Sequence, residues 1–332
     1  MRTPSSPLLV RPGPFLGTSV STPGIMFDVL LALIPVVLAS FLYFGLCALL
    51  VIGAATAGAV LTEWLISGRK IAALADWTAI LTGILLGLTL PPAIPLWMAF
   101  LGGVVAIVMG KAMWGGLGQN LFNPALVGRA FLQASFPTTL TTWAEQGQGW
   151  FTVHAANFAV PLMHVDAVTT ATPLNKMKFE QESTFIGDML LGNTPGSLGE
   201  TSALLLILCG VWLLYRRAFD WRIPVSILVV ATALAGVLFL ADMATYPTPW
   251  FALTSGGLLF GAIFMATDPA TSPMSPKGAW IFGGGIAVLV VLIRQFGGLS
   301  EGVMYAILLM NAATPLINRV VQPKPFGRGK KS

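Results

Sequence analysis

Charged side chains are scarce in this sequence of 332 residues, in which Asp, Glu, Lys and Arg together make up only 9%. A soluble globular domain usually carries roughly 25%. Hydrophobic residues instead reach 55%, and the mean hydropathy is +0.81. These values exclude an ordinary soluble domain. They predict an all-α polytopic membrane protein whose helices are embedded in the lipid bilayer.

Cysteine and histidine are nearly absent, with two residues of each. Cys47 and Cys209 lie far apart inside apolar runs, without a second thiol or a histidine at ligand spacing, so we interpret them as small core residues and predict no metal site. His154 and His164 share one polar segment with no Gly-x-Ser-x-Gly elbow, which makes hydrolysis a poor alternative. No catalytic residue is assigned.

Three further signatures are missing. Lysine and arginine stand between apolar runs rather than in a stripe with aromatic residues, so the net charge of +5 does not indicate nucleic-acid binding. No Gly-x-Gly-x-x-Gly follows a strand, so no dinucleotide-binding site is predicted in this chain. Residues 1–24 lack the apolar centre of a cleavable signal peptide.

Ten apolar runs are present, five on each side of a polar segment at 137–199. They are residues 25–44, 45–66, 76–90, 95–112, 121–136, 201–215, 224–240, 250–267, 278–293 and 302–316. A bilayer core needs about 20 helical residues. The third and fifth runs and the last two are shorter or interrupted, so we expect broken helices that the surrounding protein buries.

The two halves share spacing. Gly83 and Gly87 in the third run match Gly257 and Gly261 in the eighth. Five spans in each half require the second repeat to be inverted relative to the first. The predicted divisions are 1–24, an N-terminal lead; 25–136, the first five-helix repeat; 137–199, an external loop; 200–318, the second five-helix repeat; and 319–332, a basic tail.

Basic residues give an orientation. With a cytoplasmic N-terminus, fourteen of the 18 lysines and arginines fall on the cytoplasmic side, which leaves only Arg129, Lys176, Lys178 and Arg294 elsewhere. Both termini are therefore predicted to be cytoplasmic. The loop at 137–199 then lies outside, on the periplasmic face of a Gram-negative cell.

That loop contains the segment Asp166-Ala-Val-Thr169-Thr170-Ala171-Thr172-Pro173. Pro173 favours an extended backbone at Thr172, which presents its side chain. Without a base and an orienting partner, a threonine hydroxyl is a poor nucleophile. Taken alone, the segment is a Thr-rich turn. We expect Thr172 to lie away from the apolar core, so that Thr172→Ala leaves the bundle folded.

The segment nevertheless resembles the flavinylation signature of the family that contains the D subunit of the Rnf complex and the B subunit of the sodium-pumping NADH:quinone oxidoreductase. In that signature, Asp-x-x-[Ser/Thr]-[Gly/Thr]-Ala-Thr, the last Thr carries FMN through a phosphoester bond made by a flavin transferase. The resemblance implies covalent FMN on Thr172, with Asp166, Thr169, Thr170 and Ala171 as the rest of the motif. Thr169 and Thr170 stand where Ser and Gly are usual.

A second polar stretch interrupts the apolar runs at residues 111–129, where Gly115, Gly116 and Gly118 precede three polar side chains, Asn120, Asn123 and Arg129. An arginine in the membrane costs roughly 2.5–3.5 kcal/mol, so Arg129 should face protein, water or an anion. The pattern is similar to the same family and implies contact with the FMN phosphate or with a flavin ring edge. The alternative is that these residues only satisfy a broken helix.

Asp268, in the segment at 267–273, is the binding-site candidate of the second half. This segment is the counterpart of the stretch at 111–129 in the first half. The Asp268 carboxylate suits a cation or a flavin N–H, although Asp-Pro and Ser-Pro are also ordinary turn starters. The family resemblance implies a second, noncovalent flavin, riboflavin, within the bundle. Its contacts do not follow from spacing.

The resemblance implies an electron-transfer flavoprotein subunit of an ion-translocating NADH/ferredoxin oxidoreductase complex, a translocase whose other subunits bind NADH. Its partners would be the other Rnf subunits, especially a second covalent-FMN subunit on the periplasmic side. Two alternatives stay open, a small-solute channel or transporter of urea-channel-like fold and a purely structural scaffold subunit. A channel does not need a flavin acceptor threonine, so the loop motif favours the flavoprotein over the channel. No ion path is apparent.

Overall fold

The computed structural model describes residues 21–144, 146, 149–161, 170–182, 184–200, 202–243, 245–298 and 300–322. Among them every regular element is helical. Asp166, Thr169 and His164 of the predicted loop sites lie outside the described residues, as does most of the N-terminal lead and of the basic tail.

A helix lies in each of the apolar runs, and short helices follow between the two halves. In the first half these are α1 (Thr22–Phe44), α2 (Leu46–Ile66), η1 (Ile71–Asp76), α3 (Thr78–Leu88), α4 (Leu96–Gly110), η2 (Ala112–Trp114) and α5 (Pro124–Ser135). The connection contains α6 (Pro137–Leu140), η3 (Ala155–Phe158), α7 (Pro173–Asn175), η4 (Lys176–Glu180) and α8 (Ile186–Leu191). The second half contains α9 (Ala203–Tyr215), α10 (Arg222–Ala241), α11 (Pro249–Thr254), α12 (Leu258–Phe260), η5 (Gly261–Met265), α13 (Pro276–Phe296) and α14 (Val303–Val320).

Six of the helices are long and apolar enough to cross a membrane, namely α1, α2, α4 with η2, α10, α13 and α14. Two shorter apolar helices, α3 and α9, accompany them. The chain is therefore an all-helical polytopic membrane protein. The expectation that the last two runs fall short was wrong, because α13 has 21 residues and α14 has 18. Helix α13 begins two residues before the apolar run, at Pro276, where the Ser275 side chain caps it.

The eighth run is the broken one. Thr248 caps α11, which stops at Thr254, and the chain resumes as α12 and then η5, a π-helical segment. Gly256, between them, has φ +64°, a left-handed conformation that favours glycine. Such a break exposes backbone groups that the surrounding protein must satisfy. Several functional candidates gather around it.

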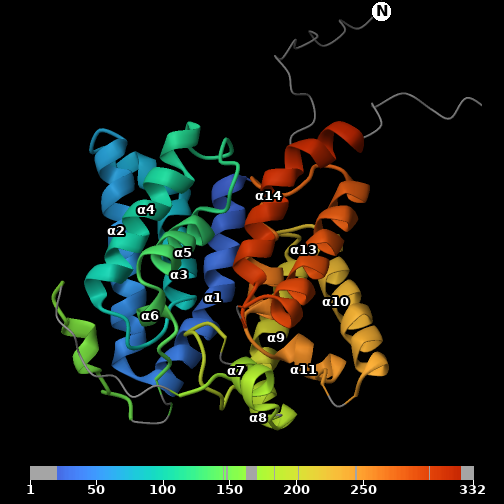
Figure 1. The fold of residues 1–332 in the computed structure, drawn as a ribbon. Helices are drawn as coiled ribbons and strands as arrows, with labels where there is room; N and C mark the ends of the chain where they lie inside the picture. Colours follow the sequence, from blue (N-terminus) through green and yellow to red (C-terminus); the bar gives the residue numbers. More distant parts are fainter. Residues whose placement is uncertain are drawn as a thin grey trace, which may run out of the picture.

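The packing of the first half recurs in the second. Helix α2 packs against α4 and α4 against α5, while α10 packs against α13 and α13 against α14. Contacts of α1 with α9 and of α5 with α14 join the halves, which lie side by side in Figure 1. One apolar core runs through both and includes Cys47 and Cys209, as predicted for small core residues. The inverted relation between the repeats stays a prediction.

The bundle has two distinct ends. At one, which we call the tail end, α1 begins and α14 finishes. Arg216 after α9 pairs there with Asp28 of α1 at 2.9 Å, and the backbone N–H of Met274 donates to Asn318 of α14. At the other, the loop end, lie α7, α8 and α11, which Figure 1 places together at the bottom.

Candidate functional site

A cavity of ≈ 240 Å³ opens at the loop end, between α5, η5 and the start of α14. Its wall combines aromatic rings with a few charged groups, among them Trp143, Phe179, Phe260, Tyr305, Arg129, Glu200 and Glu301. Ligand pockets generally begin near roughly 300 Å³, so this volume suits one ring system rather than a whole nucleotide. An apolar aromatic wall with few charges is typical of a site for a flat organic ligand.

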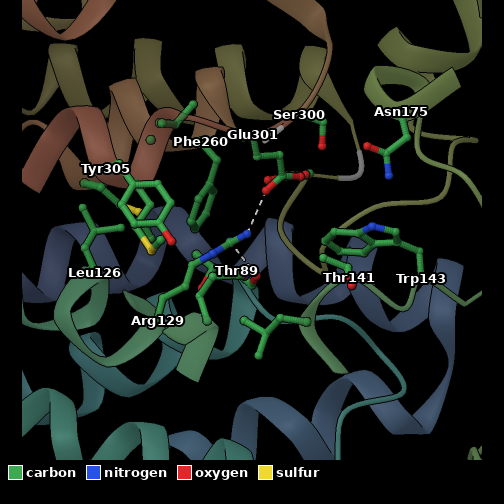
Figure 2. A pocket seen from close by; sticks show the side chains of 18 of the residues that line it. Thr89, Leu126, Arg129, Thr141, Trp143, Asn175, Phe260, Ser300, Glu301 and Tyr305 are labelled. Carbon is green, nitrogen blue, oxygen red and sulfur yellow. Dashed lines mark hydrogen bonds and ion pairs between the residues drawn. The ribbon is translucent and has the colours of Figure 1, made fainter. Parts of the chain in front are cut away.

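Arg129 stands at the centre of this loop-end cavity (Figure 2). Its Nη1 donates to the carbonyl oxygen of Thr89 at 2.6 Å, and its Nη2 donates to Glu301 Oε2 at 2.8 Å. The prediction that this arginine faces protein or an anion is confirmed. In Figure 2 the Arg129–Glu301 pair lies between Tyr305 and Phe260 on one side and Trp143 on the other.

Thr172 lies in a small pocket beside the cavity, not apart from the core as expected. Its side chain is 5% exposed, because it is the N-cap of α7 and Oγ1 accepts from the backbone N–H of Asn175 at 3.3 Å. Glu200 and Glu301 line both this pocket and the loop-end cavity, so the two spaces adjoin.

The rest of the described motif is tied to the same cavity. Thr170 donates to the carbonyl oxygen of Trp143 through its backbone N–H at 2.9 Å and through its hydroxyl at 3.2 Å. Ala171 is half-buried between Thr170 and Thr172. The Thr-rich turn therefore runs from Trp143, in the wall of the loop-end cavity, to the Thr172 pocket.

Sequence reasoning missed the two carboxylates, Glu200 and Glu301. Glu200 is partly buried, and a Cβ on Gly257 would come within 2.4 Å of its Oε1, so the carboxylate lies directly on that glycine. Burial and then the Glu301 carboxylate raise the pKa of Glu200 to about 7, against the lowering effects of Arg129 and Arg294. The available signal was position, since both residues directly precede apolar runs of the second half.

Arg294 of α13 was noted only as a basic residue on the outer side, yet it secures the broken helix. Its Nη1 donates to the Ala252 carbonyl at 3.0 Å, and its Nη2 donates to the Ser255 carbonyl at 3.2 Å. Arg294 Nε and Ser255 Oγ are buried and have no hydrogen-bond partner among the described residues. Ser255 and Gly256 line the Thr172 pocket, so the unsatisfied Ser255 hydroxyl lies next to the predicted acceptor hydroxyl.

A second cavity, at the tail end, brings together the other predicted residues. It measures ≈ 70 Å³ and is lined by Asn120, Asn123 and Asp268, together with Lys111, Thr78 and apolar side chains of α1 and α3. The structure therefore divides the candidate residues between two cavities. Arg129 and Thr172 belong to the loop end, and the two asparagines and Asp268 belong to the tail end.

The two asparagines are also structural. Asn123 caps α5 by accepting from the backbone N–H groups of Ala125 and Leu126, and its Nδ2 donates to the Met265 carbonyl in the other half at 3.1 Å. Asn120 accepts from Gly118 N–H and donates to the Phe122 carbonyl. The broken-helix interpretation is thus correct for both, while their place on the cavity wall keeps a binding role open.

Asp268 forms the turn that Asp-Pro predicts. Its carboxylate accepts from the Ala270 N–H at 3.2 Å and from the Thr271 hydroxyl at 3.4 Å. Burial raises the pKa of Asp268 to about 6, although those hydrogen bonds oppose the shift. The same carboxylate borders the tail-end cavity.

A buried ion-pair cluster stands next to this cavity. Lys111 Nζ lies 2.9 Å from Glu63 Oε1 and 3.6 Å from Asp76 Oδ2, and it donates to Thr78 Oγ1 at 2.7 Å. Asp76 caps α3 through the Thr78 N–H, and Lys111 adds a tie between α2, α3 and α4.

The two cavities meet back to back inside the bundle. Asn123 and Phe264 border the tail-end cavity, while Leu126 and Met265 border the loop-end cavity. Three residues along an α-helix advance by about 4.5 Å. A single turn of α5 and one peptide of η5 therefore separate the two spaces.

Fold and site together define a polytopic helical membrane protein with two adjoining cavities, one of them beside a buried loop threonine. The chain belongs to the NQR2, RnfD, RnfE family, whose family model matches residues 9–327.

Similar proteins cover nearly the whole chain. The D subunit of the proton-translocating ferredoxin:NAD(+) oxidoreductase complex of Clostridium ljungdahlii is 41% identical over 96% of this chain and 96% of its own length. The D subunit of the ion-translocating oxidoreductase complex of Stutzerimonas stutzeri is 41% identical over 92% of each. The D subunit of the Na(+)-translocating ferredoxin:NAD(+) oxidoreductase complex of Acetobacterium woodii is 38% identical over 96% of this chain and 95% of its own length.

Proposed function

We propose that this chain is an electron-carrier subunit of an ion-translocating ferredoxin:NAD oxidoreductase complex. Its relatives are named as D subunits of such complexes, which supports membership of this chain in one. The observation that carries the role of this subunit is the contact between the Thr172 pocket and the loop-end cavity. A channel needs no acceptor threonine beside an aromatic cavity.

The residues at the loop end suit an FMN esterified to Thr172. The ring would lie in the loop-end cavity against Trp143, Phe260 and Tyr305, and the unpartnered hydroxyl of Ser255, which lines the Thr172 pocket, would donate to the phosphate. When bound, a flavin supplies electron and hydride transfer, while the protein contributes binding, orientation and charge. Flavin attachment requires the Thr172 hydroxyl to leave its cap position, because it is buried in α7.

The tail-end cavity is the proposed position of the noncovalent riboflavin. Asn120, Asn123 and Asp268 offer donors and acceptors suited to a flavin edge. Its volume of ≈ 70 Å³ is too small for a flavin ring as the side chains stand, so binding must move them apart. Two flavins in adjoining cavities would form a relay through the bundle. No part of that relay binds NADH, which we assign to another subunit.

The relatives differ in the ion that their names give, proton in one and sodium in another, at similar identity. Identity alone therefore does not decide the ion for this chain. We place the loop end on the periplasmic face of a bacterial inner membrane, where the second covalent-FMN subunit would exchange electrons with it. Both termini would be cytoplasmic, and a flavin transferase would complete the site.

In-gel flavin fluorescence tests this proposal. The denatured chain from a host with a flavin transferase should give a fluorescent band, since denaturation removes only noncovalent flavin. Thr172→Ser, which keeps a hydroxyl, is the matched control for Thr172→Asn, which does not. A band of equal strength from Thr172→Asn would move the acceptor to another hydroxyl, and the absence of any band would remove the main reason for redox chemistry.

A further inference from the structure

The carboxylate of Glu200 has an unusual setting at the loop end. It contacts both the cavity and the Thr172 pocket, and no side chain of residue 257 separates it from the helix break. Glu301, next to it, is paired with Arg129 at 2.8 Å. Glu200 has no ion-pair partner within the described part of the chain.

The charged groups around Glu200 come from every neighbouring element. They are Glu301 before α14, Arg129 of α5 and Arg294 of α13. From η4, the ammonium of Lys178 donates to the carbonyl oxygens of Arg294 and Gly297 at the end of α13, and Tyr305 of α14 completes the wall. Arg129 and Arg294 balance Glu200 and Glu301, and the ammonium of Lys178 adds one positive charge at the end of α13.

We propose that the Glu200 carboxylate is the proton-binding site of the loop-end cavity, taking up one proton from the loop side when the cavity receives an electron and releasing it when the electron leaves. This inference rests on the proposed function. The electron comes from, and goes to, flavin or iron–sulfur groups of neighbouring subunits. Charge balances, because each added electron is matched by one proton that converts the carboxylate to a carboxylic acid.

The physical reason is the cost of an unbalanced charge in a partly dehydrated site. An extra negative charge there would be stabilised only weakly by the arginines, since Arg129 already serves Glu301. Glu200 is the carboxylate that burial already disposes to protonation, with its pKa raised to about 7.

A proton fits better than a metal cation. A cation of sodium or calcium size needs several oxygen ligands. The described residues contain no group of three His, Cys, Asp or Glu side chains arranged to hold a metal ion. One carboxyl group suffices for a proton.

The site itself can be tested without flavin. Infrared titration of the Thr172→Asn protein should show a protonated-carboxyl band that disappears near pH 7 and that is missing when Glu200→Gln is added. Asp268→Asn, at the tail end, is the matched control and should leave the band in place. Retention of the band in the Glu200→Gln protein, or its absence from the parent, overturns the site.

The coupling is tested in flavin-loaded protein. The midpoint potential of the covalent flavin, followed by its absorption spectrum, should depend on pH more weakly in Glu200→Gln than in the wild type. Equal dependence, or a potential that responds to sodium instead of pH, overturns the coupling. If no covalent flavin forms, the proposed function and the coupling fail together, while the infrared titration still decides whether Glu200 binds a proton. Equal gel-filtration profiles exclude misfolding as the cause.

Discussion

At the scale of single residues, the hydroxyl of Thr172 has two roles. It caps α7 and is the proposed flavin acceptor. Replacing an N-cap threonine by alanine costs about 1 kcal/mol, whereas asparagine retains the capping acceptor. We therefore expect Thr172→Asn to lose covalent flavin with an unchanged melting temperature, and Thr172→Ala to lose both flavin and some stability. Differential scanning fluorimetry with in-gel fluorescence separates the two effects.

Arg129 and Glu301 form an ion pair that joins the halves. Removing one partner of a buried pair costs about 3 kcal/mol because the other charge is left alone. Arg129→Gln and Glu301→Gln should each lower the melting temperature in detergent. The double variant should be less destabilised than the sum of the two, because no charge is then left unpaired. Simple additivity in this double-mutant cycle would contradict a direct interaction.

Glu200 also makes stability depend on pH. Its pKa is raised from 4.5 to about 7 in the folded protein, so between these values the folded state binds more protons than the unfolded state. The free energy of unfolding therefore falls as pH rises from about 4.5 to about 7. Glu200→Gln should weaken this fall in melting temperature. Asp268→Asn should remove a separate part of it at lower pH, since the pKa of Asp268 rises only to about 6. A pH profile that Glu200→Gln leaves unchanged would contradict the raised pKa.

At the scale of elements, the break in the eighth run positions the site. A Cβ at Gly256 would come within 2.5 Å of Leu174 Cδ1, next to Thr172, and one at Gly257 would displace the Glu200 carboxylate. Alanine at either position should reduce flavin attachment, with the larger effect at Gly256, where φ is also +64°. Gly53→Ala, in α2, is the control, because nothing lies within 4 Å of its Cβ position. Normal flavin content in Gly256→Ala would show that the break does not shape the acceptor pocket.

The elements themselves could be predicted well from the sequence. Long apolar runs predicted the helices. The break in the eighth run was not predicted, because the sequence indicated short or interrupted helices only in the third, the fifth and the last two runs. The last two apolar runs are short, but their helices are not. The Ser275 cap and polar residues at the helix ends extend α13 and α14 beyond the apolar residues. Hydropathy detects the part of a helix that faces lipid or core, and not its ends.

The site was predictable only in part. Asn120, Asn123, Arg129 and Asp268 stood out as polar residues among apolar ones, and a motif indicated Thr172. Their division between two cavities depends on long-range packing, and Arg129 and Glu301 are 172 positions apart. No local pattern encodes such a contact, so Glu301, Glu200 and the structural role of Arg294 appear only in the fold.

At the scale of the whole molecule, the basic residues of the helix ends gather at the tail end, as the Arg216–Asp28 contact illustrates. By the positive-inside rule, we predict that this end faces the cytoplasm. With Cys47→Ser and Cys209→Ser as background, an impermeant maleimide should label Asn193→Cys in intact cells and Lys70→Cys only in inverted vesicles. The reverse labelling would show that the chain has the opposite orientation in the membrane. The proposed FMN would then lie on the cytoplasmic side.

The central claim is that Thr172 carries a flavin. The most direct measurement is the mass of the proteolytic peptide that contains Thr172, from protein made with a flavin transferase. The account predicts the mass of the peptide plus FMN minus water, with fragment ions that place the addition on Thr172. An unmodified peptide from correctly inserted protein, or an addition on Thr170 instead, would contradict it.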